Sequence, residues 1–322
     1  MQNHRRPSLT FAHPRKYRTI CDLPFELLDI IISYVKADKR AVWACTLVCH
    51  FIRAVSLEHY FGTRLGVEQI SSFDHLFSFL AGNPRVCAKT RRLRISGKTR
   101  KVKKDQFRLC TPLDDTVVLR LMQLLPNLEN FDFTDFIFES IQASVLQLVP
   151  RSERVIAGPF HLRQLFFNSG LYTLPHECST SVLFAILSLF TMDELLVGEM
   201  EYDFEASAPL DLAYLHHFLS VKKLHIDVGS TAMSSATTGI LLRGLAESVE
   251  PGTLCTLDVR YHTVHDVDAI GKLLTRAGEG LTSLTLRPRV PYDASERRRW
   301  KDPLDSTWLP SFPSCINVAE SI

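Results

Sequence analysis

The sequence has no cysteine pair spaced as C-x-x-C, no secretory signal and no apolar run near the roughly 18 residues that a membrane span requires. Its eight cysteines stand singly among apolar neighbours, as buried thiols do in a reducing compartment. Glycine and proline are not in excess, which excludes a low-complexity chain. We therefore expect a folded protein of the cytoplasm or the nucleus.

Acidic residues are absent from residues 1–19. Five basic side chains lie there: Arg5, Arg6, Arg15, Lys16 and Arg18. A disordered basic leader is the first interpretation of this segment. A mitochondrial presequence is the alternative, although Pro7 and Pro14 interrupt the amphipathic helix that such a presequence needs.

Charge of one sign does not dominate the chain, whose formal net charge is +2 over 322 residues. The whole molecule therefore shows no bias toward polyanions. The local exception is residues 85–104, with ten basic side chains: Arg85, Lys89, Arg91, Arg92, Arg94, Lys98, Arg100, Lys101, Lys103 and Lys104. This density of basic residues is compatible with a nucleic-acid contact, with a nuclear localisation signal, or with a solvated loop and strand edge. No aromatic residue interleaves the segment, so base stacking is unsupported.

Residues 20–61 predict three short helices. The first is expected to begin near Asp22, with Pro24 in its first turn. Its apolar residues form two stripes, Leu27/Ile31/Tyr34 and Leu28/Ile32/Val35. A helix that is apolar on nearly every side must be covered on most sides. One stripe packs within the unit, and either the rest of this chain or a separate protein covers the other.

Asp38 is expected to cap a second helix over residues 41–49, and a third helix is expected over residues 50–59. The spacing Leu23-Pro24, Glu26-Leu27-Leu28, Ile31-Ile32 and then Leu47-Val48-Cys49 resembles an F-box. F-box modules are three-helix units that dock onto the small Skp adaptor of an SCF ubiquitin ligase. Ile52 departs from the family, which often has tryptophan there. The resemblance implies adaptor contacts at Leu23, Pro24, Leu27, Ile31, Val48 and Cys49.

The remaining chain repeats an apolar triplet at positions i, i+3 and i+5. The copies are Thr90/Leu93/Ile95, Leu128/Phe131/Phe133, Leu162/Leu165/Phe167, Met192/Leu195/Val197, Val221/Leu224/Ile226, Leu254/Leu257/Val259 and Leu281/Leu284/Leu286. The triplets predict short strands, and the stretches between them have helical periodicity. The expected helices cover 114–125, 180–190, 210–219, 237–249 and 267–278. Regular alternation predicts an α/β fold with parallel strands.

The repeat resembles a leucine-rich-repeat solenoid, which F-box proteins often carry. It is a degenerate copy, because Phe136, Gly170, Gly229 and His262 stand where that family usually has asparagine. The predicted organisation is a leader (1–19), an F-box-like module (20–61), a linker helix (62–84), the curved solenoid (85–290) and an irregular tail or cap (291–322). A generic α/β fold is the alternative.

Strand alternation predicts that residues i+2, i+4 and i+6 of each repeat face the concave surface. The candidate substrate-binding residues on it are Arg92, Arg94, Asp132, Phe166, Leu196, His225, Asp258, Arg260 and Arg287. Phe166 and Leu196 are apolar among polar neighbours and are candidate anchors. A slip in phase would bury them instead.

Catalytic and metal-binding signals are weak. The GKT at 97–99 lacks the preceding glycine of a phosphate-binding loop, because position 92 is arginine. His262 with His265, and His216 with His217, lack the further ligands that a metal needs. We expect no cofactor, no metal and no membrane contact.

These observations favour a non-enzymatic subunit that binds the Skp adaptor, and through it a cullin, and that holds an unknown protein substrate. A nucleic-acid-associated scaffold that uses residues 85–104 is the alternative. An α/β enzyme whose site the sequence hides is a third hypothesis.

Overall fold

The structure, a computed structural model, describes residues 20–103, 106–109, 111–139, 158–168, 177–198, 203–204, 212–227, 234–261, 264–288 and 317–318. The chain divides into two compact units, Met1–Gly62 and Thr63–Ile322. We call them the N-terminal unit and the sheet unit. The predicted leader, and the predicted tail except residues 317–318, lie outside the described residues.

The N-terminal unit consists of a 3₁₀ turn and three helices. They are η1 (Ile20–Asp22), α1 (Phe25–Val35), α2 (Lys39–Cys45) and α3 (His50–Phe61). Its core is formed by Leu28, Ile32, Val42 and Val55, with Leu23, Phe25, Cys45 and Tyr60 packed around them. The Asp38 side chain caps α2 as predicted and accepts hydrogen bonds from the amides of Arg40 (2.9 Å) and Ala41 (3.1 Å). Ile52 is buried, so the departure from tryptophan does not expose α3.

Two predicted helix boundaries in this unit are wrong. Helix α1 begins after Pro24 and not near Asp22, because a proline disfavours the helical conformation of the residue before it. The Pro24 carbonyl accepts the first helical hydrogen bonds, from the amides of Leu27 and Leu28. Helix α2 ends at Cys45 and not at residue 49, and the chain then turns until Cys49, in extended conformation, precedes α3.

The sheet unit is built on a parallel β-sheet. Nine strands lie in the order β1-β2-β6-β8-β10-β12-β13-β14-β15, and all these neighbours run parallel. Their bounds are Arg64–Ile70, Arg92–Gly97, Asn130–Thr134, Phe160–Asn168, Phe190–Val197, Ser220–Ile226, Thr256–Tyr261, Ser283–Pro288 and Asn317–Val318. Within the described part of the chain, β1 does not pair with β14 or β15, so the sheet is open and forms no closed barrel.

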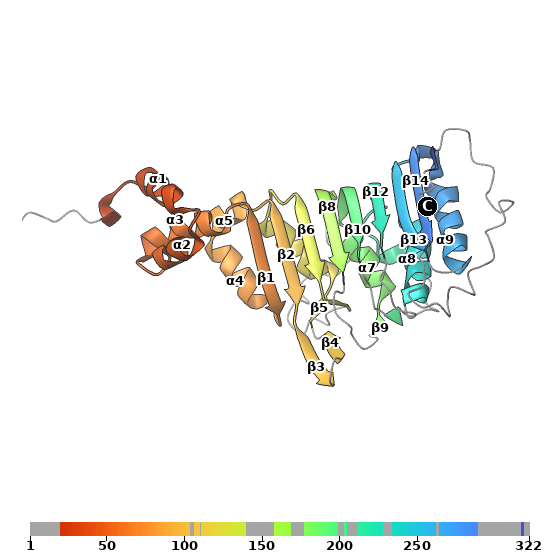
Figure 1. The fold of residues 1–322 in the computed structure, drawn as a ribbon, viewed down its shortest axis with the longest axis horizontal. Helices are drawn as coiled ribbons and strands as arrows, with labels where there is room; N and C mark the ends of the chain where they lie inside the picture. The colour runs from red at the N-terminus through yellow and green to blue at the C-terminus, as the bar shows by residue number, and fades with distance from the viewer. Residues whose placement is uncertain are drawn as a thin grey trace, which may run out of the picture. The chain divides into compact units, whose positions relative to one another are not determined.

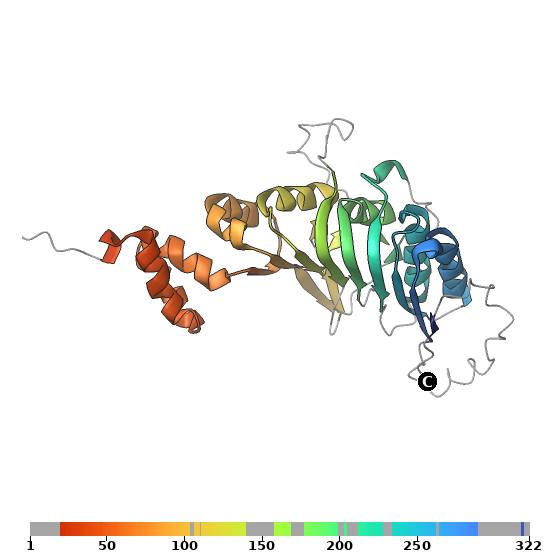
Figure 2. The same cartoon turned by 90° about the horizontal axis from the view of Figure 1, so that it is seen from above.

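Described α-helices occur in five of the connections between these strands and lie along one side of the sheet (Figures 1 and 2). They are α4 (Asp74–Gly82), α5 (Pro84–Lys89), α6 (Asp115–Leu124), α7 (Thr180–Leu187), α8 (Ser234–Ser248) and α9 (Val264–Ala277). Short pairs of strands lie outside the main sheet: β3 (Thr99–Lys103) with β4 (Gln106–Leu109), β5 (Pro112–Leu113) with β7 (Ile137–Phe138), and β9 (Glu177–Cys178) with β11 (Asp203–Phe204). The predicted α/β class is therefore confirmed.

The apolar triplets of successive repeats lie in register across the sheet. Leu93, Phe131, Leu165, Leu195, Leu224, Leu257 and Leu284 form one continuous row of Cα partners. The triplets are buried under the helices, except for the half-buried Leu286. Phe133 stacks on Phe167 at 5.5 Å between ring centroids, and Phe138 meets both rings edge-on. These three rings are among the largest fully buried side chains of the described residues.

Two assignments in the sheet unit are wrong. Residues 62–84, predicted as a linker helix, contain α4 but also strand β1, so the sheet begins at Arg64 and not within 85–290. Residues 210–219 form no α-helix over their described part, only the 3₁₀ turn Leu212–Tyr214 (η3). The backbone there bonds to neighbouring elements instead, with the amides of His216 and Leu219 donating to Ser188 Oγ and to the Ser248 carbonyl.

Candidate functional site

The N-terminal unit presents large apolar side chains to solvent. They are Ile20, Leu27, Ile30, Ile31, Tyr34, Val35, Trp43, Leu47, Val48 and Phe51, which we call the apolar surface. Helical spacing places Leu27, Ile30, Ile31 and Tyr34 on one face of α1, opposite the buried Leu28 and Ile32. Concentrations of exposed apolar side chains in a small unit mark interaction sites.

The predicted adaptor contacts separate into two groups in the structure. Leu27, Ile31 and Val48 are 46%, 41% and 64% exposed, and Pro24 is exposed as well. Leu23 is half-buried against the core of the unit, and the half-buried Cys49 holds the position before α3. These two residues therefore contribute less to an exterior surface than the sequence suggests.

Sequence reasoning missed Trp43, Leu47 and Phe51 as candidate contacts. Trp43 is 48% exposed because the short helix α2 turns its neighbour Val42 into the core. Leu47 is 73% exposed because α2 ends before it. A correct prediction of where α2 ends would have identified Leu47, because helical periodicity no longer directs a side chain toward the core after the helix has ended.

The second candidate site is the side of the sheet that no helix of the described segments covers. All nine predicted substrate-binding residues lie on it, in the predicted phase. We call it the open face. It is defined by alternate strand residues: Arg92, Arg94, Ser96; Asn130, Asp132, Thr134; Gln164, Phe166, Asn168; Glu194, Leu196, Gly198; Lys223, His225, Asp227; Thr256, Asp258, Arg260; Ser283, Thr285 and Arg287. Among them only Thr134 falls in the buried class. Phe166 and Leu196 are half-buried on this face, so the phase slip that would place them in the core does not occur.

Ion pairs and hydrogen bonds link neighbouring strands across the open face. Arg92 Nε lies 3.6 Å from Asp132 Oδ2, Arg260 donates to Asp227 at 3.0 Å, and Arg287 donates to Asp258 at 2.6 Å. Such partly exposed pairs each contribute at most about 1 kcal/mol. Their main consequence here is that these arginines are already neutralised.

The pKa values of two carboxyl groups in the sheet shift in opposite directions. Burial raises the pKa of the Asp132 carboxyl above its ordinary value, and the nearby Arg92 and Arg94 charges only partly oppose the shift. The hydrogen bond from Lys222 Nζ, at 2.8 Å, lowers the pKa of the Asp193 carboxyl. Asp132 therefore resembles a desolvated acid, while Asp193 is a solvated ion-pair partner.

The described backbone of the basic segment 85–104 runs through α5, β2 and β3, with Arg91 and Lys98 between these elements. Arg91 pairs with Glu129 and Arg92 with Asp132, which removes two charges from the cluster. Lys104 lies outside the described residues. The nucleic-acid alternative gains no support from this arrangement.

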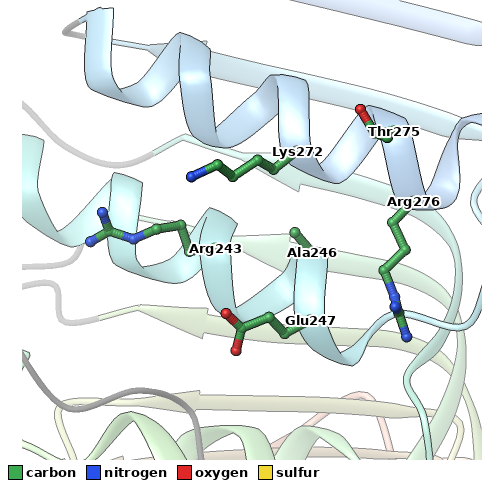
Figure 3. Close-up of a pocket in the computed structure, with 6 residues that line it drawn as sticks. All are labelled: Arg243, Ala246, Glu247, Lys272, Thr275 and Arg276. Atoms are coloured by element: carbon green, nitrogen blue, oxygen red, sulfur yellow. The ribbon is translucent and has the colours of Figure 1, made fainter.

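A groove of about 410 Å³ lies between α8 and α9 on the helical side of the sheet unit. It is lined by Arg243, Ala246, Glu247, Lys272, Thr275 and Arg276 (Figure 3). Lys272 pairs with Asp268 at 3.3 Å, and Arg276 extends toward the Phe218 ring and the Val249 carbonyl. The lining side chains diverge in the figure, so this groove does not focus ionisable groups on one point.

Ser188, His216 and Asp115 approach one another but do not form a catalytic arrangement. The His216 ring contacts Asp115 Oδ2 at 2.9 Å. Ser188 Oγ is buried and binds the backbone amide of His216, not its ring, while donating to the Ala185 carbonyl. A nucleophilic serine must instead face the imidazole. This cluster is therefore a structural tie between η3, α6 and α7.

Metal and membrane features are absent from the part of the chain that the structure describes. No three histidine, cysteine or acidic side chains of the described segments converge as a metal site would require. No described helix combines the length and apolar character needed to cross a bilayer.

Comparison with known proteins gives no family for this chain. No model of a known protein family matches it, and no curated protein is significantly similar to it in sequence.

Proposed function

We propose that this protein is the substrate-recognition subunit of an SCF-type ubiquitin ligase. The N-terminal unit is an F-box module that binds a Skp-type adaptor through the apolar surface. The sheet unit is a leucine-rich-repeat-like solenoid whose open face holds a protein substrate. The observation that carries the proposal is the exposure of Leu27, Ile31 and Val48, which occupy contact positions of the F-box spacing.

The energetics of the apolar surface support a protein partner. Full burial of one leucine or isoleucine side chain is favourable by about 1.5–3 kcal/mol. Leu27, Ile31 and Val48 are between 41% and 64% exposed, and the aromatic side chains of Tyr34 and Trp43 add to the surface. Aromatic side chains of this kind are frequent hot spots in protein interfaces. A partner that covers this surface would gain enough to offset the entropy cost of association.

The form of the sheet unit supports the second half of the proposal. The helices of its described segments lie on one side, and the strand residues that face the other side are largely polar. Doubly wound α/β enzymes cover both faces of a parallel sheet. A sheet covered on one side curves with its helices outward, which is the geometry that solenoids use for large partners. In this role the protein supplies proximity: it raises the effective concentration of a substrate lysine near the ligase.

Co-purification of the full chain with a Skp-type adaptor tests the proposal. We expect a stable complex with the wild type, and loss of the complex when Leu27 and Ile31 are both changed to aspartate. The matched control is Phe218→Asp, which changes a 54% exposed aromatic residue of the sheet unit. Equal adaptor retention by the wild type and the Leu27→Asp/Ile31→Asp variant would contradict the proposal.

A further inference from the structure

The open face has an apolar centre. Phe166 and Leu196 are direct Cα partners on adjacent strands β8 and β10. Both are half-buried, whereas Leu165 and Phe167, which alternate with Phe166, are 0% and 1% exposed under the helices. A Cβ atom at Gly198 would lie 3.2 Å from the Phe166 ring, so glycine at this position leaves room for the ring beside it. Phe166 and Leu196 therefore form an apolar patch on the open face and are not part of the core beneath the helices.

Carboxylates lie beside this patch on β6 and on β10, while His225 on β12 is the Cα partner of Leu196. Asp132 is the Cα partner of Phe166 on β6. Glu194, two residues before Leu196 on β10, accepts a hydrogen bond from Gln164 at 2.7 Å and lies 3.4 Å from His225 Nε2. No lysine or arginine of the described residues lies within 4.0 Å of the Glu194 carboxylate, although Lys223 is beside it in register.

Two hydrogen-bond acceptors beside the Phe166–Leu196 patch have no donor. Asp132 Oδ1 and Asn168 Oδ1 are both buried and have no hydrogen-bond partner. Asp132 lies beside Phe166 on the next strand, and Asn168 follows Phe166 by two residues on the same face. A buried acceptor without a donor is costly, and a ligand that supplies N–H groups relieves that cost.

We propose that this centre of the open face, Asp132, Phe166, Asn168, Glu194 and Leu196, binds a basic peptide segment in which arginine or lysine adjoins an apolar residue. The inference names the substrate class of the proposed ligase subunit and rests on that function. The apolar side chain covers Phe166 and Leu196. The neighbouring cation reaches the carboxylates, where its N–H groups meet the free acceptors, and its stem or guanidinium lies over the Phe166 ring.

An acidic or phosphorylated segment does not fit the same place. Three arginines of the open face already have carboxylate partners. Arg92 pairs with Asp132, Arg260 with Asp227 and Arg287 with Asp258. Arg94 and Lys223 are the open-face cations without an ion pair within 4.0 Å among the described residues. They are the Cα partners of Asp132 and Glu194, and neither is a direct partner of Phe166 or Leu196. An anion at the centre would meet the Glu194 carboxylate, which has no lysine or arginine within 4.0 Å among the described residues.

Selection from a random library tests the inference. The probe is an eight-residue peptide library displayed on phage, selected against the full chain in complex with the adaptor. We expect enrichment of sequences that place arginine or lysine next to an apolar residue. The same selection on Asp132→Asn/Glu194→Gln should lose this enrichment. Glu247→Gln/Asp268→Asn is the matched control, because it removes two carboxylates from the helical side and should leave the enrichment intact.

Affinity of the most enriched peptide, made synthetically, gives the quantitative result. We expect binding at least tenfold weaker to Asp132→Asn/Glu194→Gln and to Phe166→Ser, with a melting temperature of the carboxyl variant no lower than that of the wild type. Salt should weaken binding to the wild type more than to the carboxyl variant. Failure to enrich any sequence, enrichment of acidic sequences, or equal affinity for the wild type and both variants would overturn the inference.

Adaptor retention is measured on the same preparations and separates the two proposals. Retained adaptor together with absent basic-peptide binding rejects only the substrate class. Lost adaptor binding in the wild type rejects the proposed ligase function itself.

Discussion

The two units use apolar side chains in opposite ways. In the sheet unit the apolar residues of each strand lie beneath the helices, and the uncovered side of the sheet is largely polar. In the N-terminal unit the core is small, and side chains as large as Tyr34 and Trp43 face solvent at 84% and 48% exposure. A long repeat buries its own apolar surface, whereas a three-helix unit with apolar residues on both helix faces has no interior for the second face. That difference supports the proposed partner at the N-terminal unit.

The largest effect is expected in the aromatic core of the sheet unit. Phe133→Ala removes a ring that is 1% exposed and stacks on Phe167. Loss of the ring and the cavity left behind should lower the free energy of unfolding by about 3–5 kcal/mol. Urea unfolding followed by circular dichroism measures this change. Phe218→Ala, at a 54% exposed ring, should change the free energy by less than about 0.5 kcal/mol. Similar losses at the two sites would contradict the assigned core.

Two adjacent leucines sharpen the comparison within one helix. Leu28 is 1% exposed and Leu27 is 46% exposed. Leu28→Ala should destabilise the N-terminal unit by about 2–4 kcal/mol. Leu27→Ala should leave thermal unfolding nearly unchanged and weaken adaptor binding about tenfold, as hot-spot truncations do. Calorimetry of unfolding and of adaptor titration separates these outcomes. Equal effects of both variants on both measurements would mean that the surface and the core of α1 are not distinct.

The cap of α2 gives a smaller effect. Asp38→Ala removes the acceptor for the amides of Arg40 and Ala41 and should cost about 1 kcal/mol. Because Leu47 and Val48 follow α2, adaptor affinity should fall modestly along with stability. Asp38→Asn is the control that keeps the capping oxygen, and it should retain most of both. A fall as large as that of Asp38→Ala would indicate that charge and not capping matters here.

The smallest effects are the opposite pH dependences of two carboxyl groups in the sheet unit. Asp193 has a lowered pKa in the folded chain, so its stabilising effect is present above the ordinary value of 3.8 and is lost as the pH falls through the lowered pKa. Asp193→Asn should therefore destabilise the chain at neutral pH, by less than about 1 kcal/mol because solvent screens the pair, and this difference should vanish on acidification.

Asp132 has a raised pKa in the folded chain, so its charge is unfavourable above that raised value, and the penalty is lost as the pH falls through it toward 3.8. Asp132→Asn should therefore be slightly more stable than the wild type at neutral pH, with the gain shrinking as the pH falls. Melting temperatures of both variants between pH 7 and pH 4 test these signs. Parallel pH trends for the two variants would show that desolvation does not control the titration of Asp132.

Much of the fold could be predicted from local sequence patterns. The triplets ending at Ile95, Phe133 and Phe167 predicted strands because alternation with a buried side has period two, and the strands lie where the pattern places them. The same alternation predicted the open face, including Phe166 and Leu196. The errors at residues 62–84 and 210–219 have one cause: these stretches satisfy their backbone groups through distant partners, which no local pattern records.

The candidate sites divide in the same way. Sequence by itself determined that α1 has two apolar stripes and that one of them needs a cover, because helical periodicity is a local property. Only the tertiary structure decided which stripe is inside, since Val42 and Val55 select Leu28 and Ile32 by packing against them. It also decided that Asp132 and Glu194 border one apolar patch, because parallel register brings together residues 62 positions apart in the chain.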